Sequence, residues 1–137
     1  MTHNSDAEIL HIYERWHATV VGGDLDGLMA LYADDAILET PLILATLRDK
    51  TEGILKGKSA IRPFFETGFR KLRNDLGRWF SNGRQLTWEY PRATPQGNQV
   101  DLVEVMDIAS GLIAHHRVYW GWVGFKALMT ASKEPAS

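Results

Sequence analysis

GLIAHHRVYWGWVGF, residues 111–125, is the stretch around which the rest of this chain can be interpreted. Its β-branched and aromatic residues predict a strand, in which successive side chains point to opposite faces. One face then holds His116, Val118, Trp120 and Trp122, and the other holds His115, Arg117, Tyr119 and Gly121. An imidazole between large aromatic rings suggests a small-molecule pocket, whereas a twisted sheet that buries these rings as core is the alternative.

Two further strand patterns precede this stretch. Asn82-Gly83 is a tight-turn dipeptide that predicts a hairpin, whose second arm alternates through Leu86, Trp88 and Tyr90. Residues 100–108 predict the next strand, and Ser110-Gly111 predicts the turn into residues 112–125. The C-terminal half is therefore expected to be an antiparallel meander.

The N-terminal half shows helical spacing instead. Ser5 and Glu8 have the spacing of a capping box, and apolar residues follow at three- and four-residue steps as far as Gly22-Gly23. Asp24 can cap a shorter second helix, in which Tyr32 belongs to the buried face. Three helices are thus expected, the third over residues 59–72.

Between these helices the predicted structure is less regular. Asp34-Asp35 is expected to turn the chain into a short strand over residues 36–40, which Pro41 ends. Residues 41–58 are apolar without a clean period, which indicates a lid or a dimer contact. Helices followed by a meander predict an α+β domain, with three N-terminal helices packed on a curved antiparallel sheet.

Composition limits the classes of function. A chain of 137 residues, 45% apolar and 23% charged, fits one globular domain spanning residues 1–137, with a core over about 6–128. The net charge of -2 and the lack of a basic block argue against a nucleic-acid or membrane partner. The polar start and the absence of a long apolar run indicate a cytoplasmic protein.

Covalent and cofactor chemistry is also restricted. The chain has no cysteine, so disulfides and thiolate catalysis are excluded. It has no phosphate loop, nucleophile elbow or dinucleotide fingerprint, and no cofactor is expected. Adjacent strand histidines diverge, so His115 and His116 are poorly placed to share one ion, and no metal site is expected.

Three motifs together resemble the nuclear transport factor 2-like superfamily, especially its SnoaL-like polyketide cyclases, ketosteroid isomerases and limonene epoxide hydrolases. They are GDLDGLMALYADDA at residues 23–36, the Gly-x-x-Ala-Ile-Arg helix start at residues 57–62, and the final Gly-x-Ile…Arg-x-Tyr strand. The resemblance implies a cone-shaped (cystatin-like) fold around an apolar cavity, often assembled as a homodimer. The same scaffold hosts unrelated functions, so the motifs indicate the fold better than the reaction.

The catalytic residues of these relatives do not carry over. Where the isomerases have a tyrosine and a general-base aspartate, this chain has Trp16 and Thr40, and their second aspartate falls near Val103. The last-strand aspartate of the epoxide hydrolases falls on Val118, and their asparagine falls on Glu39. Isomerase or epoxide hydrolase activity by the familiar mechanisms is therefore not expected.

A different site is consistent with the residues present. Glu39 and His116 form a candidate general acid/base pair, because burial raises the pKa of a carboxylate and histidine titrates near neutrality. Alternatively, Glu39 pairs with Arg48, Arg62 or Arg117. The expected apolar walls of a substrate cavity are Trp16, Trp88, Tyr90, Val103, Val105, Val118 and Trp120.

Two classes of function follow. One is an enzyme of isomerase, cyclase or lyase type that cyclises, dehydrates or isomerises a largely apolar small molecule. The other is a non-catalytic ligand-binding or accessory domain. A homodimer is expected in either case, through the sheet face that carries Leu102, Glu104, Met106, Arg117 and Tyr119.

Overall fold

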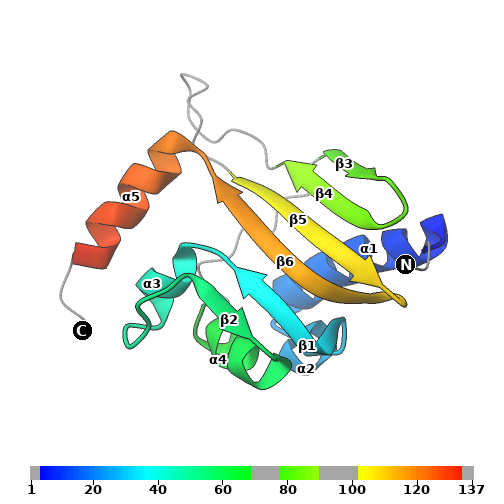
Figure 1. The fold of residues 1–137 in the computed structure, drawn as a ribbon, viewed down its shortest axis with the longest axis horizontal. Coiled ribbons are helices and arrows are strands. Elements are labelled where there is room, and N and C mark those ends of the chain that lie inside the picture. The colour runs from blue at the N-terminus through cyan, green and yellow to red at the C-terminus, as the bar shows by residue number, and fades with distance from the viewer. Residues whose placement is uncertain (1–3, 69–77, 90–101, 134–137) are drawn as a thin grey trace.

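The computed structural model of the protein describes residues 4–68, 78–89 and 102–133 (Figure 1). Tyr90, the predicted turn over residues 91–99 and the predicted end of the third helix at Leu72 lie outside these ranges. The helices are α1 (Asp6–Gly22), α2 (Leu25–Met29), α3 (Leu42–Thr46), α4 (Lys58–Gly68) and α5 (Trp122–Lys133). The strands are β1 (Tyr32–Glu39), β2 (Ile54–Lys56), β3 (Arg78–Ser81), β4 (Gln85–Glu89), β5 (Leu102–Ala109) and β6 (Leu112–Trp120).

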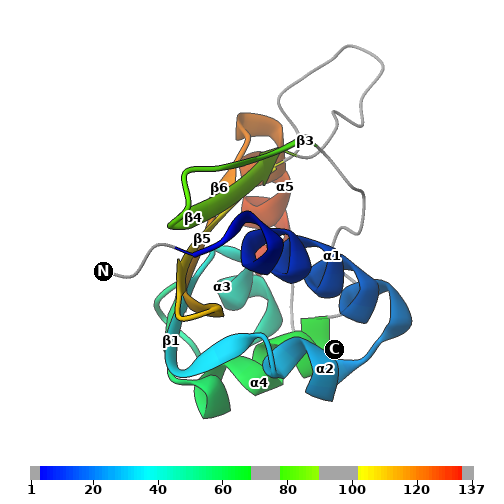
Figure 2. The same cartoon turned by 90° about the vertical axis from the view of Figure 1, so that its right-hand side faces the viewer.

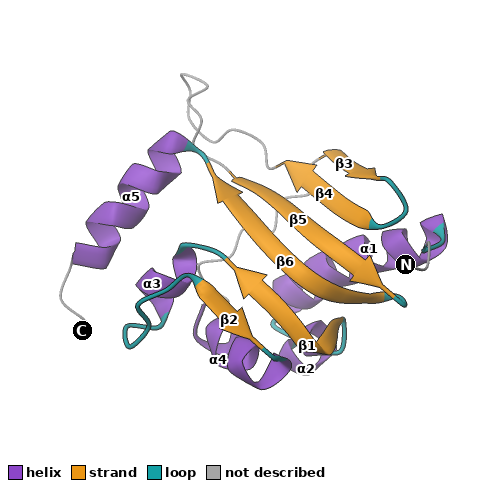
Figure 3. Ribbon diagram, viewed as in Figure 1, coloured by secondary structure: helices purple, strands orange, loops and turns teal. Residues whose placement is uncertain are grey.

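The strands form one curved, open sheet in the order β2-β1-β6-β5-β4-β3 (Figure 3). Four neighbouring pairs are antiparallel, but β1 and β6 run parallel, so the sheet is mixed and not purely antiparallel as predicted. Parallel neighbours need a long connection between them. Along the sequence, the segment from α3 to β5 connects β1 to β6. Periodicity within one strand cannot reveal that two strands so far apart in the sequence are neighbours.

The helices α1, α2 and α4 cover one face of this sheet, which we call the inner face; the opposite side is the outer face (Figure 2). The capping box of α1 is confirmed, since the Ser5 hydroxyl accepts from the Glu8 N–H at 3.2 Å and the Glu8 carboxylate accepts from the Ser5 N–H at 2.9 Å. Gly23 ends the helix with a left-handed φ of 66°, which glycine adopts without strain.

The second helix is shorter than predicted. It ends at Met29, and Tyr32 begins β1 instead of completing a helical face. Tyr32 pairs with Ile113 of β6, and this sheet pairing overrides the local helical spacing. Asp34 and Asp35 consequently lie in the strand as exposed residues and do not form a turn.

The apolar segment over residues 41–58 is part of the body of the fold. It contains α3 and the edge strand β2, and it buries Ile43 and Leu55 in the core. A segment whose apolar residues are packed in this way is not a free lid. The third predicted helix begins at Lys58, directly after Gly57 with its left-handed φ of 91°.

The strand predicted to run to Phe125 ends at Trp120, and a helix not predicted from the sequence, α5, follows from Trp122. Figure 1 shows α5 extending away from the sheet. Trp122, Phe125 and Met129 are 51%, 50% and 42% exposed on this helix. Their three- and four-residue spacing was the signal that the strand assignment overlooked.

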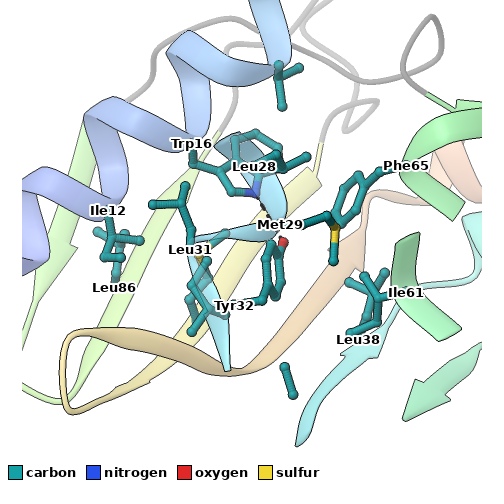
Figure 4. Packing of buried hydrophobic residues seen from close by; sticks show 14 of the residues in the cluster. Ile12, Trp16, Leu28, Met29, Leu31, Tyr32, Leu38, Ile61, Phe65 and Leu86 are labelled. Carbon is teal, nitrogen blue, oxygen red and sulfur yellow. Dashed lines mark hydrogen bonds between the residues drawn. The ribbon is translucent and has the colours of Figure 1, made fainter. Parts of the chain in front are cut away.

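The hydrophobic core lies between the inner face and the helices. Figure 4 shows side chains from α1, β1, α4 and β4 converging there, among them Ile12, Tyr32, Phe65 and Leu86. Its fully buried side chains include Trp16, Trp88 and Phe64. Among the described residues, the helices are too short or too polar to cross a membrane.

Candidate functional site

The two adjacent histidines of β6 point to opposite faces of the sheet, and each meets its own glutamate. His116 faces inward, with its Nε2 2.5 Å from the Glu104 carboxylate, and both side chains are almost fully buried. His115 faces outward, with its Nε2 2.5 Å from the Glu39 carboxylate, in a partly exposed pair. The inward orientation expected for His116 is confirmed, but Glu39 lies on the opposite face.

The register explains why Glu39 and His116 do not meet. Leu38 is the strand partner of His116 and is buried beside it, whereas Glu39 is level with Arg117. Residues paired across neighbouring strands share a face, so a histidine and a glutamate that differ by one step in register are separated by the sheet itself. The predicted Glu39–His116 pair is therefore replaced by two separate His–Glu pairs.

On the inner face, four side chains form one hydrogen-bonded chain. The Trp16 indole N–H donates to the Tyr32 hydroxyl at 3.1 Å (Figure 4), and the Tyr32 hydroxyl lies 2.8 Å from Nδ1 of His116. Tyr32 still has its own hydroxyl proton to donate, and we assign Nδ1 of His116, its other recorded neighbour, as the acceptor. The proton of neutral His116 is then on Nε2, where it is donated to the Glu104 carboxylate.

Burial supports this assignment of protons. It raises the pKa of Tyr32 well above its usual range, and the indole hydrogen bond from Trp16 offsets only part of that rise. Tyr32 therefore keeps its proton at neutral pH and remains a donor toward His116. The Trp16–Tyr32–His116–Glu104 chain, which we call the inner relay, holds the Glu104 carboxylate in a defined orientation.

Aromatic rings surround the inner relay. Trp16 and Trp88 lie 5.4 Å apart between ring centroids, and Trp88 is the strand partner of Glu104. Val118 and Trp120 lie on the same inner face, half-buried, toward the end of β6. Of the predicted wall residues, these four are brought around the relay.

Val103 and Val105 were predicted to form the floor of this cavity, with Glu104 on the opposite side, and the structure reverses that assignment. Glu104, Met106 and Ile108 are buried, and the two valines lie half-buried on the outer face. Both faces of β5 carry apolar residues and one acid, so alternation alone was ambiguous. The pairing with His116 decides which acid is buried.

His17 is a second buried histidine beside the inner relay. Its ring lies 5.0 Å from that of Trp88, and Nδ1 donates to the Tyr13 carbonyl at 2.8 Å. Within the described part of the chain, Nε2 has no hydrogen-bond partner. Burial lowers the pKa of His17, while the Tyr13 carbonyl and the charge of Glu104 act in the opposite direction.

The outer face carries a second polar cluster. The Arg117 guanidinium binds the Asp107 carboxylate through two hydrogen bonds of 2.7 and 2.9 Å, and Gln85 donates to the same carboxylate at 2.8 Å. The guanidinium of Arg117 lowers the pKa of Asp107, and Asp107 in turn raises the pKa of Arg117. Arg117 is thereby committed to Asp107 and not to Glu39.

A hollow of about 310 Å³ lies where β1 and β6 end, and we call it the rim hollow. It is lined by Glu39, Thr40, Pro41, Leu44, Gly53, Arg117, Val118 and Tyr119. One of these lining residues, Val118, is the strand partner of Glu104. Among the described residues, no group of three histidines or acids has the arrangement of a metal site.

Three functional candidates in this arrangement were not predicted. The sequence pattern predicts a helical position for Tyr32 and the outer face for Glu104, and it gives Thr40 no role of its own. The pattern of β5 could have suggested Glu104 if the period had been counted from Met106 and Ile108. Nothing local to Tyr32 or Thr40 indicates a site, since each has a partner on the distant strand β6.

Comparison with known proteins agrees with this architecture. The SnoaL-like domain family matches residues 13–116. None of the curated proteins matches the sequence. Solved structures of nuclear transport factor 2-like and ketosteroid isomerase-like proteins share the fold, as the sequence motifs predicted.

Three solved structures illustrate the likeness. A SnoaL-like protein of unknown function from Burkholderia thailandensis has a TM-score of 0.65 at 16% identity, over 88% of this chain and 99% of that one. A Mycobacterium tuberculosis protein in complex with estradiol-17beta-hemisuccinate has a TM-score of 0.62 at 21% identity, over 84% and 95%. The epoxide hydrolase/cyclase-like enzyme of pyran ring formation in salinomycin has a TM-score of 0.61 at 18% identity, over 86% and 94%.

Proposed function

Because the chain belongs to the SnoaL-like domain family, we propose that it is an enzyme that moves a proton on a largely apolar small molecule. The observation that carries this proposal is the inner relay, in which a buried imidazole holds the Glu104 carboxylate. Ionisable side chains are rarely buried among aromatic rings, and those that are have a partner, so a buried His–Glu pair there marks a candidate functional site.

We assign the proton transfer to Glu104. A carboxylate in this position can take a proton from a carbon next to a carbonyl group and return it to another atom of the ligand. Returning it to carbon isomerises the molecule, and returning it to a departing hydroxyl group releases water. Cyclisation needs the same removal of a proton, after which the carbanion attacks a carbonyl carbon of the same ligand and the proton on Glu104 passes to the resulting alkoxide.

His116 then has a positioning role, because both of its ring nitrogens are engaged. Its Nε2–H steadies the carboxylate, and Tyr32 and Trp16 keep the imidazole in the tautomer that can do so. The apolar walls are Trp16, Trp88, Val118 and Trp120. We place the approach of the ligand to Glu104 beside Val118, which lines the rim hollow and is the strand partner of Glu104.

An assay that does not require the natural substrate tests this proposal. The ketone 2-tetralone in D₂O exchanges its α-protons, and ¹H NMR follows that exchange. The protein should accelerate it over buffer, and Glu104→Gln should reduce the acceleration by about 10²-fold or more. Glutamine still accepts the hydrogen bond from His116, so the fold should survive, which thermal unfolding checks.

The matched control is Glu14→Gln, the same substitution at an exposed position of α1, which should exchange like the wild type. If 2-tetralone bound without any acceleration of exchange, the alternative function of a non-catalytic ligand-binding domain would be favoured. If Glu104→Gln exchanged as fast as the wild type, the assignment of the proton transfer would be wrong.

We also propose a homodimer, through the outer face and not through the mixed set of residues named from the sequence. Of that set, Glu104 and Met106 are buried inside the protomer, while Arg117 and Tyr119 face outward. Phe80 and Tyr119 are 54% and 57% exposed on this face, which carries no helix among the described residues. Large exposed apolar side chains on an uncovered sheet support association.

A further inference from the structure

We propose that the rim hollow binds the oxygenated end of a neutral ligand, one that carries a carbonyl or ether oxygen close to a hydroxyl group. It rests on the proposed function only in taking Glu104 as the place where the reaction occurs; the binding itself does not depend on that reaction. Its evidence is the hydrogen bonding of Thr40 and the balance of charges around the hollow.

Thr40 is a buried polar group on the wall of the hollow, only 4% exposed. Its hydroxyl oxygen accepts from the Leu42 N–H at 3.2 Å and from the Trp120 indole N–H at 3.3 Å. With both lone pairs occupied, the hydroxyl can act only as a donor. Within the described residues, the structure records no acceptor for that proton, so a ligand oxygen in the hollow is a suitable partner.

The backbone fixes the position of this donor. The Thr40 N–H donates to the Gly53 carbonyl at 3.0 Å, which ties the end of β1 to the chain before β2. A Cβ on Gly53 would stand 3.0 Å from the Thr40 carbonyl oxygen, so only glycine permits this approach without a shift. The hydroxyl is therefore held from three directions, as a preorganised binding group requires.

Glu39 supplies the complementary acceptor. Its carboxylate is 44% exposed at the hollow and is held at one oxygen by His115, which leaves the carboxylate able to accept from a ligand hydroxyl group. Both residues line the hollow, Glu39 as the last residue of β1 and Thr40 as the first residue beyond the strand, where the alternation between sheet faces has ended. Together they match a ligand in which an oxygen acceptor and a hydroxyl donor lie close to each other.

The charges around the hollow select a neutral ligand. Glu39 is paired with His115, and Arg117 is paired bidentately with Asp107. Because each charged side chain at the hollow is already bound by a partner, neither an anion nor a cation finds an unpaired counter-charge there. The remaining wall of Pro41, Leu44 and Val118 suits the carbon skeleton.

The probes are 4-hydroxy-2-butanone, which has both oxygens, and 2-butanone, which lacks the hydroxyl group. Titration of the ¹⁵N-labelled protein, followed at the amides of Thr40, Gly53 and Val118, should give a Kd in the millimolar range for the hydroxy ketone and weaker binding of 2-butanone. Thr40→Val should raise the Kd for the hydroxy ketone by about fivefold. Thr40→Ser keeps the hydroxyl group, and its Kd should remain within about twofold of the wild-type value.

Because Thr40→Val also removes an acceptor from Leu42 and Trp120, thermal unfolding and the ¹⁵N amide spectrum of this variant check that the fold is retained. In Glu39→Ala the preference for the hydroxy ketone over 2-butanone should vanish. Equal binding of the two ketones to the wild type, tighter binding of choline or acetate than of the hydroxy ketone, or full binding by Thr40→Val would overturn the inference.

Glu104→Gln distinguishes this inference from the proposed function. It should bind the hydroxy ketone like the wild type while losing proton exchange on 2-tetralone. Loss of exchange in Glu104→Gln together with unchanged binding by Thr40→Val would leave the proton-transfer proposal standing and refute the assignment of the rim hollow. Binding that depends on Thr40, without any exchange activity, would support the hollow and refute the enzyme.

Discussion

Removal of one hydroxyl group, in Tyr32→Phe, should measure how much the inner relay contributes to stability. The substitution keeps the ring, which is 1% exposed and lies 5.7 Å from Phe65 between centroids, so apolar packing is nearly unchanged. It removes the acceptor of the Trp16 indole N–H and the donor to Nδ1 of His116. Both polar atoms then remain in the interior without the partner they had.

The magnitude follows from those two atoms. A buried donor or acceptor that loses its partner costs about 1–3 kcal/mol, and two of them are affected here. Allowing for some relaxation of the rings, we expect Tyr32→Phe to lower the free energy of unfolding by about 2–4 kcal/mol. Domains of this size have a total stability of roughly 5–15 kcal/mol, so the loss is readily measured.

Urea unfolding, followed by circular dichroism, provides the assay. The midpoint should fall while the m-value stays constant, because the surface exposed on unfolding is the same. Tyr119→Phe removes a hydroxyl from a side chain that is 57% exposed, and it should change the free energy by no more than about 0.5 kcal/mol. A loss below about 0.5 kcal/mol for Tyr32→Phe as well would show that the relay is not formed.

Two further predictions concern pH and assembly. Burial lowers the pKa of His17, so as the pH falls the unfolded chain takes up a proton at this histidine near pH 6.5, before the folded chain does. The contribution of His17 to the free energy of unfolding should therefore be full above that pH and should decline below it, by at most about 1.4 kcal/mol per pH unit. Urea unfolding between pH 7 and 5 should show a smaller decline for His17→Phe than for the wild type. If the two slopes are equal, His17 is not the group responsible. Sedimentation velocity at micromolar concentration should show a dimer that Phe80→Lys dissociates and that Val21→Lys, at a 64% exposed position on α1, leaves intact; a wild-type monomer would contradict the proposed interface.

Local sequence patterns were sufficient for a large part of this architecture. The capping box at Ser5, the hairpin at Asn82-Gly83 and the inward orientation of His116 follow from interactions within a few residues, and all three are present. Periodicity is a short-range property, and wherever one face was clearly more apolar than the other it indicated the buried face correctly.

Only the tertiary structure decided which glutamate each histidine meets. Glu104 is 12 residues from His116 and Glu39 is 76 residues from His115, and both pairings depend on strand register. A shift of one residue in register moves a side chain to the other face of the sheet. This one ambiguity explains both errors of the sequence prediction: Glu39 was expected beside His116 where Glu104 lies, and Val103 and Val105 were expected on the inner face where Glu104 and Met106 lie. The parallel pairing of β1 with β6 likewise arises from contacts between distant segments, which the composition of neither strand encodes.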